Sequence, residues 1–171
     1  MLLTIYNNVQ IQIDEEDKER ILAQLEDGCN WYFSTKTGQV LGWCVFHGKV
    51  KEKIALSRVI MRCYDKHLDV DHINNDRYDL RKQSLRVCSH QENCFNTRKH
   101  SNNTSGYKGV YFRKDRNVWY SRIRTKIGRI NIGVFDTAED AAKAYDVEAL
   151  KWHGEFAVLN FPKDSNQNDK S

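Results

Sequence analysis

Apolar and polar positions form short, changing patterns along the first hundred residues. Residues Asp14–Leu25 fit an amphipathic helix with a narrow apolar stripe, an N-cap at its start and acids in its first turn. The stretch 29–56 has the pattern of short strands separated by turns, which predicts a small antiparallel sheet. A short helix is expected over Ser57–Tyr64. We expect the large aromatic side chains of this region to lie in a core: Trp31, Phe33, Trp43 and Phe46.

The second half of the chain predicts three strands followed by one helix. Polar turns separate the strand candidates, which are Tyr107–Phe112, Val118–Thr125 and Arg129–Phe135. In the middle strand Tyr120, Arg122 and Arg124 share one side, so the sheet should have a cationic face and an apolar face. Thr137 is a suitable cap for the helix. The helix stripe that would lie on the apolar face consists of small and aromatic residues: Ala138, Ala142, Tyr145, Ala149 and Trp152.

A polar, turn-rich stretch with the sequence RKHSNNTS separates these two patterns and predicts a linker. We expect a support region and a compact ββα unit within residues 1–98, the ββα unit covering about 68–98. A linker at 99–105 and a separate domain at 106–162 follow, and the polar tail 163–171 should be disordered. The predicted fold class is α+β, ending in a three-stranded antiparallel sheet packed on one helix.

Composition favours a chain that stays inside the cell. No run of apolar residues approaches the roughly 18 that a membrane helix needs, and Met1–Asn8 lacks the basic start of a signal peptide. The five cysteines are an odd number without a C-x-x-C pair, which indicates a reducing compartment. We therefore expect a cytoplasmic protein with no membrane partner. It should be a monomer, because no self-complementary apolar face stands out.

Charge is distributed unevenly. Residues 1–98 carry 14 Lys and Arg against 14 Asp and Glu, whereas residues 99–131 carry nine Lys and Arg against one acid, a balance of +8. Such a block favours a polyanion as partner. A solvated basic face without a partner is the alternative interpretation.

One stretch, VDHINNDRYDLRKQSLRVCSHQENCFN at residues 70–96, contains candidate chemistry. Asp71 and His72 lie side by side after a short apolar run, and an Asn follows about twenty residues later on a candidate helix. Carboxylate and amide oxygens suit Mg²⁺, and a neutral imidazole can take a proton from water at neutral pH. The plainer alternative is an Asp that caps a turn beside an ordinary half-buried His.

The same stretch resembles the HNH motif of phage and intron-encoded homing endonucleases, a ββα-metal site. The resemblance implies that Asp71 and Asn93 hold one divalent ion, Mg²⁺ or Mn²⁺, and that His72 is the general base. Ser84 stands where the family pattern has an Asn that helps to hold the catalytic loop, so the resemblance gives Ser84 that role. His90 and Asn96 are secondary candidates for contacts in the site or to phosphate, and ordinary polar residues at the two ends of the helix are the equal alternative. Arg81 and Arg86 are candidates for phosphate contacts, with simple exposure as the alternative.

Residues 105–161 are similar to the APETALA-type (ethylene-response-factor) DNA-binding domain, through the segments SGYKGVYFRK, WYSRIR and INIGVFDTAEDAAKAYDVEALKWHGEFAVLNF. The resemblance implies a three-stranded sheet that enters the major groove of DNA. Three positions differ from the plant pattern: Tyr111 replaces an Arg, Arg122 a Glu and Asn131 a Trp. The resemblance places DNA contacts at seven positions: Lys108, Tyr111, Arg113, Arg122, Arg124, Arg129 and Asn131.

Together these patterns predict a site-specific, metal-dependent endonuclease of the homing type that hydrolyses phosphodiester bonds in double-stranded DNA. It would act in a bacterial or phage-infected cell. An RNA target is disfavoured because the major groove of RNA is deep and narrow. The alternative hypothesis is a non-catalytic DNA-binding regulator with a degenerate HNH unit.

Overall fold

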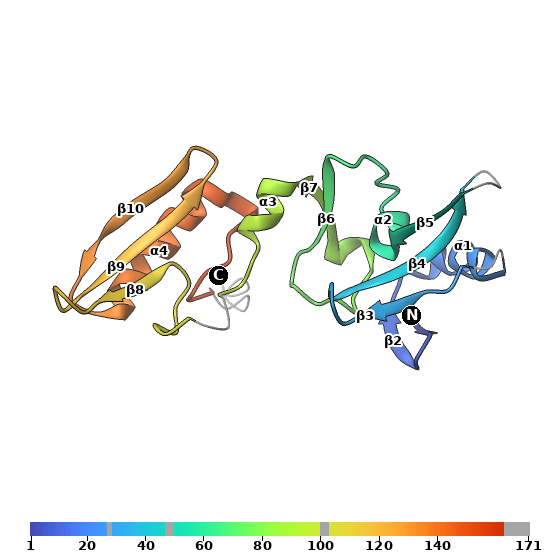
Figure 1. Ribbon diagram of the computed structural model, residues 1–171, viewed down its shortest axis with the longest axis horizontal. Coiled ribbons are helices and arrows are strands. Elements are labelled where there is room, and N and C mark those ends of the chain that lie inside the picture. The colour runs from blue at the N-terminus through green and yellow to red at the C-terminus, as the bar shows by residue number, and fades with distance from the viewer. Residues whose placement is uncertain (27–28, 47–49, 100–102, 163–171) are drawn as a thin grey trace, which may run out of the picture. The chain divides into compact units, whose positions relative to one another are not determined.

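The computed structural model describes residues 1–26, 29–46, 50–99 and 103–162, and the chain divides into two compact units, Met1–Asn93 and Cys94–Ser171. We call them the N-terminal and C-terminal units. Both combine antiparallel sheets with helices, so the predicted α+β class is confirmed (Figure 1). The division lies ahead of the predicted linker 99–105, part of which, like the predicted disordered tail 163–171, falls outside the described residues.

The N-terminal unit begins with a hairpin that the sequence pattern did not predict. Strands β1 (Leu2–Ile5) and β2 (Val9–Gln12) pair antiparallel, and both Asn7 and Asn8 in their turn have positive φ, which Asn tolerates better than most residues. Helix α1 (Glu15–Glu26) follows as predicted. Ile11, Ile13 and Ile21 from this segment are fully buried and begin the core.

A three-stranded sheet, β3 (Tyr32–Ser34), β4 (Gln39–Phe46) and β5 (Val50–Ala55), continues this unit in the order β3-β4-β5. Gly42 lies against the ring of the buried Trp31, since a Cβ there would come within 2.6 Å of it. Trp43 therefore points to the opposite face and is 49% exposed, so the prediction that it lies in the core is wrong. Phe33 is half-buried and stacks on Tyr78, while the side chain of Phe46 is outside the described residues.

The last part of the N-terminal unit contains a helix and a second hairpin. Helix α2 (Leu56–Ile60) is shorter than predicted because Arg62 turns to a φ of 50°. Strand β6 (Leu68–His72) then pairs antiparallel with β7 (Leu85–Ser89), after a 3-10 turn η1 (Lys82–Ser84). Helix α3 (His90–Phe95) follows directly, where the pattern placed it.

The C-terminal unit is a three-stranded sheet covered on one face by a helix (Figure 1). Strands β8 (Val110–Arg113), β9 (Val118–Thr125) and β10 (Gly128–Phe135) pair antiparallel in the order β10-β9-β8, and helix α4 (Ala138–His153) leads into the 3-10 turn η2 (Gly154–Phe156). Thr137 caps α4 by accepting a 3.1 Å hydrogen bond from the Asp140 backbone N–H. This confirms the predicted sheet and helix.

The helix can lie close to the sheet because small residues face it. Ala141, Ala142 and Ala149 are fully buried, and Tyr145 packs beside Ile123 of β9. Of the predicted stripe, Ala138 and Trp152 are only partly buried, and Ala141 and His153 lie inside instead. The core thus occupies one face of the sheet and leaves the other face to solvent.

Gly109 marks the point of closest approach between this core and the chain entering β8. Its φ is 76°, and a Cβ at this position would lie 2.1 Å from Cδ2 of Tyr145. Gly106 has a similar φ of 81° but nothing within 4 Å of such a Cβ. Substitution of both glycines by alanine would strain the backbone, but only the substitution at Gly109 would also create a packing clash.

We expect Gly109→Ala to destabilise the protein by about 1–3 kcal/mol more than Gly106→Ala, because only the first forces Tyr145 to move. Urea unfolding followed by circular dichroism measures both free energies. Equal losses in the two variants would contradict the close packing inferred at Gly109.

Candidate nucleic-acid interface

Asp71, one of the two predicted metal ligands, lies at the end of β6 and is buried. It is directly opposite Arg86 of β7, which donates to Oδ2 from Nε at 2.9 Å and from Nη2 at 2.8 Å. Both side chains of this ion pair are largely shielded from water. The guanidinium therefore balances the charge of the carboxylate, as a bound cation would.

Asn93, the other predicted ligand, lies on α3 and contacts a different carboxylate. Its Nδ2 donates to Oδ2 of Asp69 at 3.0 Å, and the same oxygen lies 2.9 Å from Nδ1 of His90. Although burial works to raise it, these hydrogen bonds hold the pKa of Asp69 below its ordinary value. Sequence reasoning missed Asp69, and the available signal was that alternate residues of a strand share a face, which places Asp69 beside Asp71.

His72 follows Asp71 and is also buried. Burial lowers the pKa of its imidazole, and the positive charge of Arg77 adds to the effect. The peptide group that joins His72 to Ile73 is bonded at both ends: the His72 carbonyl accepts from the N–H of Asn75 at 2.9 Å, and the N–H of Ile73 donates to the carbonyl of Ser84 at 3.0 Å. His72 is therefore a neutral, well-held histidine at pH 7.

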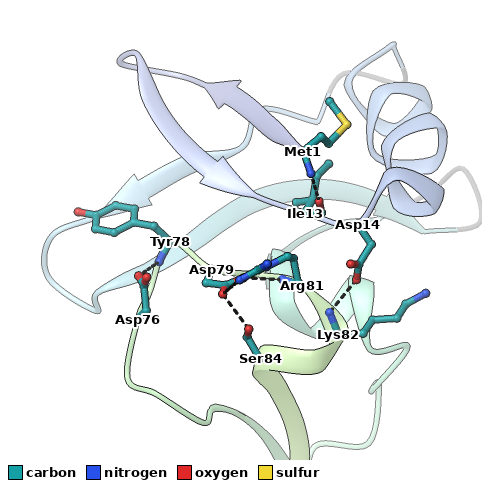
Figure 2. A network of polar contacts seen from close by, with 9 residues as sticks. All are labelled: Met1, Ile13, Asp14, Asp76, Tyr78, Asp79, Arg81, Lys82 and Ser84. Carbon is teal, nitrogen blue, oxygen red and sulfur yellow. Dashed lines mark hydrogen bonds and ion pairs between the residues drawn. The ribbon is translucent and has the colours of Figure 1, made fainter. Parts of the chain in front are cut away.

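Ser84 contributes to this turn through its backbone, while its side chain points elsewhere. Figure 2 shows its hydroxyl directed at Asp79, to whose Oδ2 it donates at 2.7 Å. Arg81 also donates to Asp79, from Nε at 2.8 Å and from Nη2 at 2.6 Å. The Arg81 guanidinium, more than any other group, holds the pKa of Asp79 well below its usual range. Ser84 thus helps to fix a charged network next to the β6–β7 turn.

The two residues predicted to hold a metal ion contact different partners. Asp71 is bonded by Arg86 and Asn93 by Asp69, so each is held in a contact of its own. Within the described ranges, no cluster of three or more His, Cys, Asp or Glu side chains is placed to bind an ion. The metal site stays a prediction, and no chemistry is derived through it.

The residues predicted to contact DNA lie mostly on the face of the β8–β10 sheet opposite α4. Arg122 and Arg124 of β9 are exposed and alternate with the buried side chains of Ser121, Ile123 and Thr125, and Arg129 and Asn131 of β10 are exposed as well. Arg124 and Arg129 are cross-strand partners, as are Arg122 and Asn131. Tyr111 of β8 stacks on Tyr120 of β9 with ring centroids 5.6 Å apart. The face therefore combines cations with flat aromatic rings.

Two of the seven predicted contacts differ from this group. Arg113 lies in a two-bond ion pair with Asp115, which lowers the pKa of Asp115 to about 2. Lys108 precedes β8, and its Nζ donates to the carbonyl of Phe95 at 2.8 Å. Burial lowers the pKa of the Lys108 ammonium to about 8. Lys108 therefore has a structural contact of its own.

His153 at the end of α4 is a buried ionisable residue that the sequence pattern missed. Its Nε2 lies 2.7 Å from the carbonyl of Arg124, so Nε2 carries the proton, and its ring stacks on Phe95 at 4.0 Å. Its Nδ1 is buried and finds no hydrogen-bond partner in the part of the chain that the structure describes. Burial lowers the pKa of this histidine. The folded state therefore favours neutral His153.

Comparison with known proteins gives partial matches. No family model matches the chain. The ethylene-responsive transcription factor ERF024 of Arabidopsis thaliana is 53% identical over 58 residues, 33% of this chain and 32% of that protein. The AP2-like ethylene-responsive transcription factors ANT of Arabidopsis thaliana and CRL5 of Oryza sativa are 32% and 33% identical and cover 50% and 53% of this chain. The chain spans about a third or less of the length of these curated relatives.

These comparisons correct the predicted activity. The relatives are transcription factors of the AP2/ERF type, whereas an endonuclease was expected, so the prediction of an enzyme of the HNH homing class is contradicted. The expected bacterial or phage setting receives no support from them. Among the helices of the described residues, none has the length and apolar character needed to cross a bilayer. The chain is similar to AP2/ERF-type transcription factors.

We expect Ser84→Ala to lower the free energy of unfolding by about 1–3 kcal/mol, because it removes a buried hydrogen bond to a charged carboxylate. Urea unfolding measures the change. Ser34→Ala is the matched control, since Ser34 accepts only a long 3.4 Å bond in an exposed turn. A loss no larger than in the control would show that the Asp79 network contributes little.

We expect acid to destabilise the protein partly through His153. Its pKa is lowered in the folded state, so below about pH 6.5 the unfolded chain binds a proton that the folded chain excludes. Stability should therefore fall as the pH drops from 7.5 to 5.5. His153→Gln keeps an N–H that can donate to the Arg124 carbonyl but does not titrate, so its melting temperature should fall less over this range. If the melting temperatures of wild type and His153→Gln fall equally over this range, His153 does not contribute to the acid destabilisation.

Proposed function

We propose that this protein is a non-catalytic, DNA-binding regulator that inserts the exposed face of the β8–β10 sheet into the major groove of duplex DNA. The observation that carries the proposal is the set of cations on that face, with the core on the other. The similarity to transcription factors supports it.

The size of the sheet suits this binding mode. Neighbouring strands lie about 4.8 Å apart, so three strands span about 10 Å between their backbones. The major groove of B-form DNA is about 12 Å wide, so the width of the three-stranded sheet fits within the width of the groove. An RNA duplex has a deep and narrow major groove that would not admit it.

The pairing of charges on the face also favours an anionic partner. Arg124 and Arg129 are directly opposite each other on neighbouring strands, an arrangement that repels in the free protein. Their guanidinium groups would gain from phosphate groups on either side of the groove. Binding to DNA would therefore relieve a repulsion that the fold builds in.

The N-terminal unit has a supporting role in this proposal. The carboxylate of Asp71 is balanced by Arg86, and Asn93 is bonded to Asp69, so these residues stabilise the β6–β7 hairpin and α3. This corresponds to a ββα element without catalytic activity.

We expect the full chain to bind a duplex library with an affinity that falls steeply as salt rises. Arg124→Gln and Arg129→Gln should each reduce the slope of log affinity against log salt by about 1, since each removes one phosphate contact. Fluorescence anisotropy at several salt concentrations measures the slope.

Lys143→Gln is the matched control, because Lys143 is an exposed cation of α4 paired with Glu139. It removes the same charge from the other side of the unit and should leave the slope unchanged. Equal effects of all three variants would contradict the proposed face. Cleavage of the bound DNA in Mg²⁺ or Mn²⁺ would contradict the proposed absence of catalysis.

A further inference from the structure

Arg122 differs from the other arginines of the exposed face because two neutral side chains hold its guanidinium. Its Nε donates to Oδ1 of Asn131 at 2.8 Å, and its Nη2 donates to the hydroxyl of Tyr111 at 3.0 Å. The carbon of the guanidinium lies 5.3 Å from the centre of the Tyr111 ring. The orientation of this long side chain is therefore set before any ligand binds.

The two anchors belong to the strands on either side of Arg122. Asn131 is its direct cross-strand partner on β10. Tyr111 lies on β8 opposite Tyr120, the residue two positions before Arg122, and stacks on that ring. Each anchor is held by the sheet itself, so the orientation of Arg122 depends on the register of all three strands.

The anchored guanidinium keeps enough donors to recognise a base. Arginine has five N–H groups, and the bonds to Asn131 and Tyr111 use two of them. The N–H groups of Nη1 and one of Nη2 remain on an exposed side chain. Guanine presents two acceptors, O6 and N7, to the major groove, and an arginine fork matches both. Both anchors are uncharged, so the positive charge of Arg122 is not cancelled.

The anchors themselves have a positioning role. An asparagine that reads adenine must offer both its carbonyl oxygen and its amide N–H groups. The Oδ1 of Asn131 already accepts from Arg122, so Asn131 is committed to orienting that side chain. The hydroxyl of Tyr111 is used in the same way.

The neighbouring arginines do not combine a guanidinium held by neutral side chains with an uncancelled charge. Asp115 holds Arg113 by two bonds and cancels its charge. Arg124 and Arg129 oppose each other across the strands, and their charges suit phosphate contacts. A flexible arginine loses side-chain entropy when a base fixes it, a cost that Arg122 has largely met in the free protein.

We propose that Arg122 reads a guanine in the major groove and is the main specificity-determining residue of the sheet, with Asn131 and Tyr111 as its positioning residues. This inference rests on the proposed function, because it requires the sheet to lie in the groove.

The test is selection of bound sequences from a random duplex library by the full-length protein and by Arg122→Lys. Lysine keeps the positive charge but not the fork. The wild-type protein should select a site with a strongly preferred guanine, and Arg122→Lys should reduce the preference at that one position by roughly 5- to 150-fold.

Arg116→Lys is the matched control. Arg116 also bonds a tyrosine hydroxyl, that of Tyr120 at 3.2 Å, but it lies in the β8–β9 turn. This variant should select the same site as the wild type. Asn131→Ala and Tyr111→Phe should each weaken the same guanine preference in part, since they keep Arg122 but release it. Thermal melting checks that every variant is folded.

The outcomes separate this inference from the proposed function. If the wild-type protein does not bind duplex DNA, the proposed function fails. If it selects a site that Arg122→Lys selects equally well, the proposed function stands and the assignment of Arg122 is wrong. The assignment is also wrong if Arg116→Lys loses the guanine preference as strongly as Arg122→Lys.

Discussion

Close packing of helix α4 against the β8–β10 sheet is the constraint on which the C-terminal unit depends. Gly109 allows Tyr145 to approach the chain entering β8, and buried alanines let the helix axis come near the strands. Side chains of a strand alternate between two faces, so packing Ile123 against the helix forces Arg122 and Arg124 to the other side. The cationic face is thus a direct consequence of how the core is formed.

The same sheet also fixes how the side chains on the cationic face are oriented. Strand register puts Asn131 and Tyr111 beside Arg122, and the neighbouring strands restrict the motion of all three. An arginine on a loop would have to be ordered by its ligand, at a cost in entropy. A rigid sheet meets that cost during folding, and Arg122, Asn131 and Tyr111 all lie on its strands.

The N-terminal unit shows how the same residues support two interpretations. Asp71, His72 and Asn93 resemble a nuclease motif in order and spacing, and the hairpin and helix that carry them are present. Their contacts, however, form ion pairs and hydrogen bonds within the unit: Asp71 with Arg86, and Asn93 with Asp69. Together with the similarity to transcription factors, these contacts favour a structural role.

The sequence by itself determined the local elements. Alternation predicted the strands of the C-terminal sheet and its two faces, and Thr137 marked the start of α4, because these signals depend only on neighbours along the chain. Tertiary structure decided which residues meet. The Asp71–Arg86 pair, the partial burial of Lys108, the burial of His153 and the exposure of Trp43 depend on register and packing between distant segments. Patterns of single residues do not contain that information, so the anchoring of Arg122 became visible only when three strands were placed side by side.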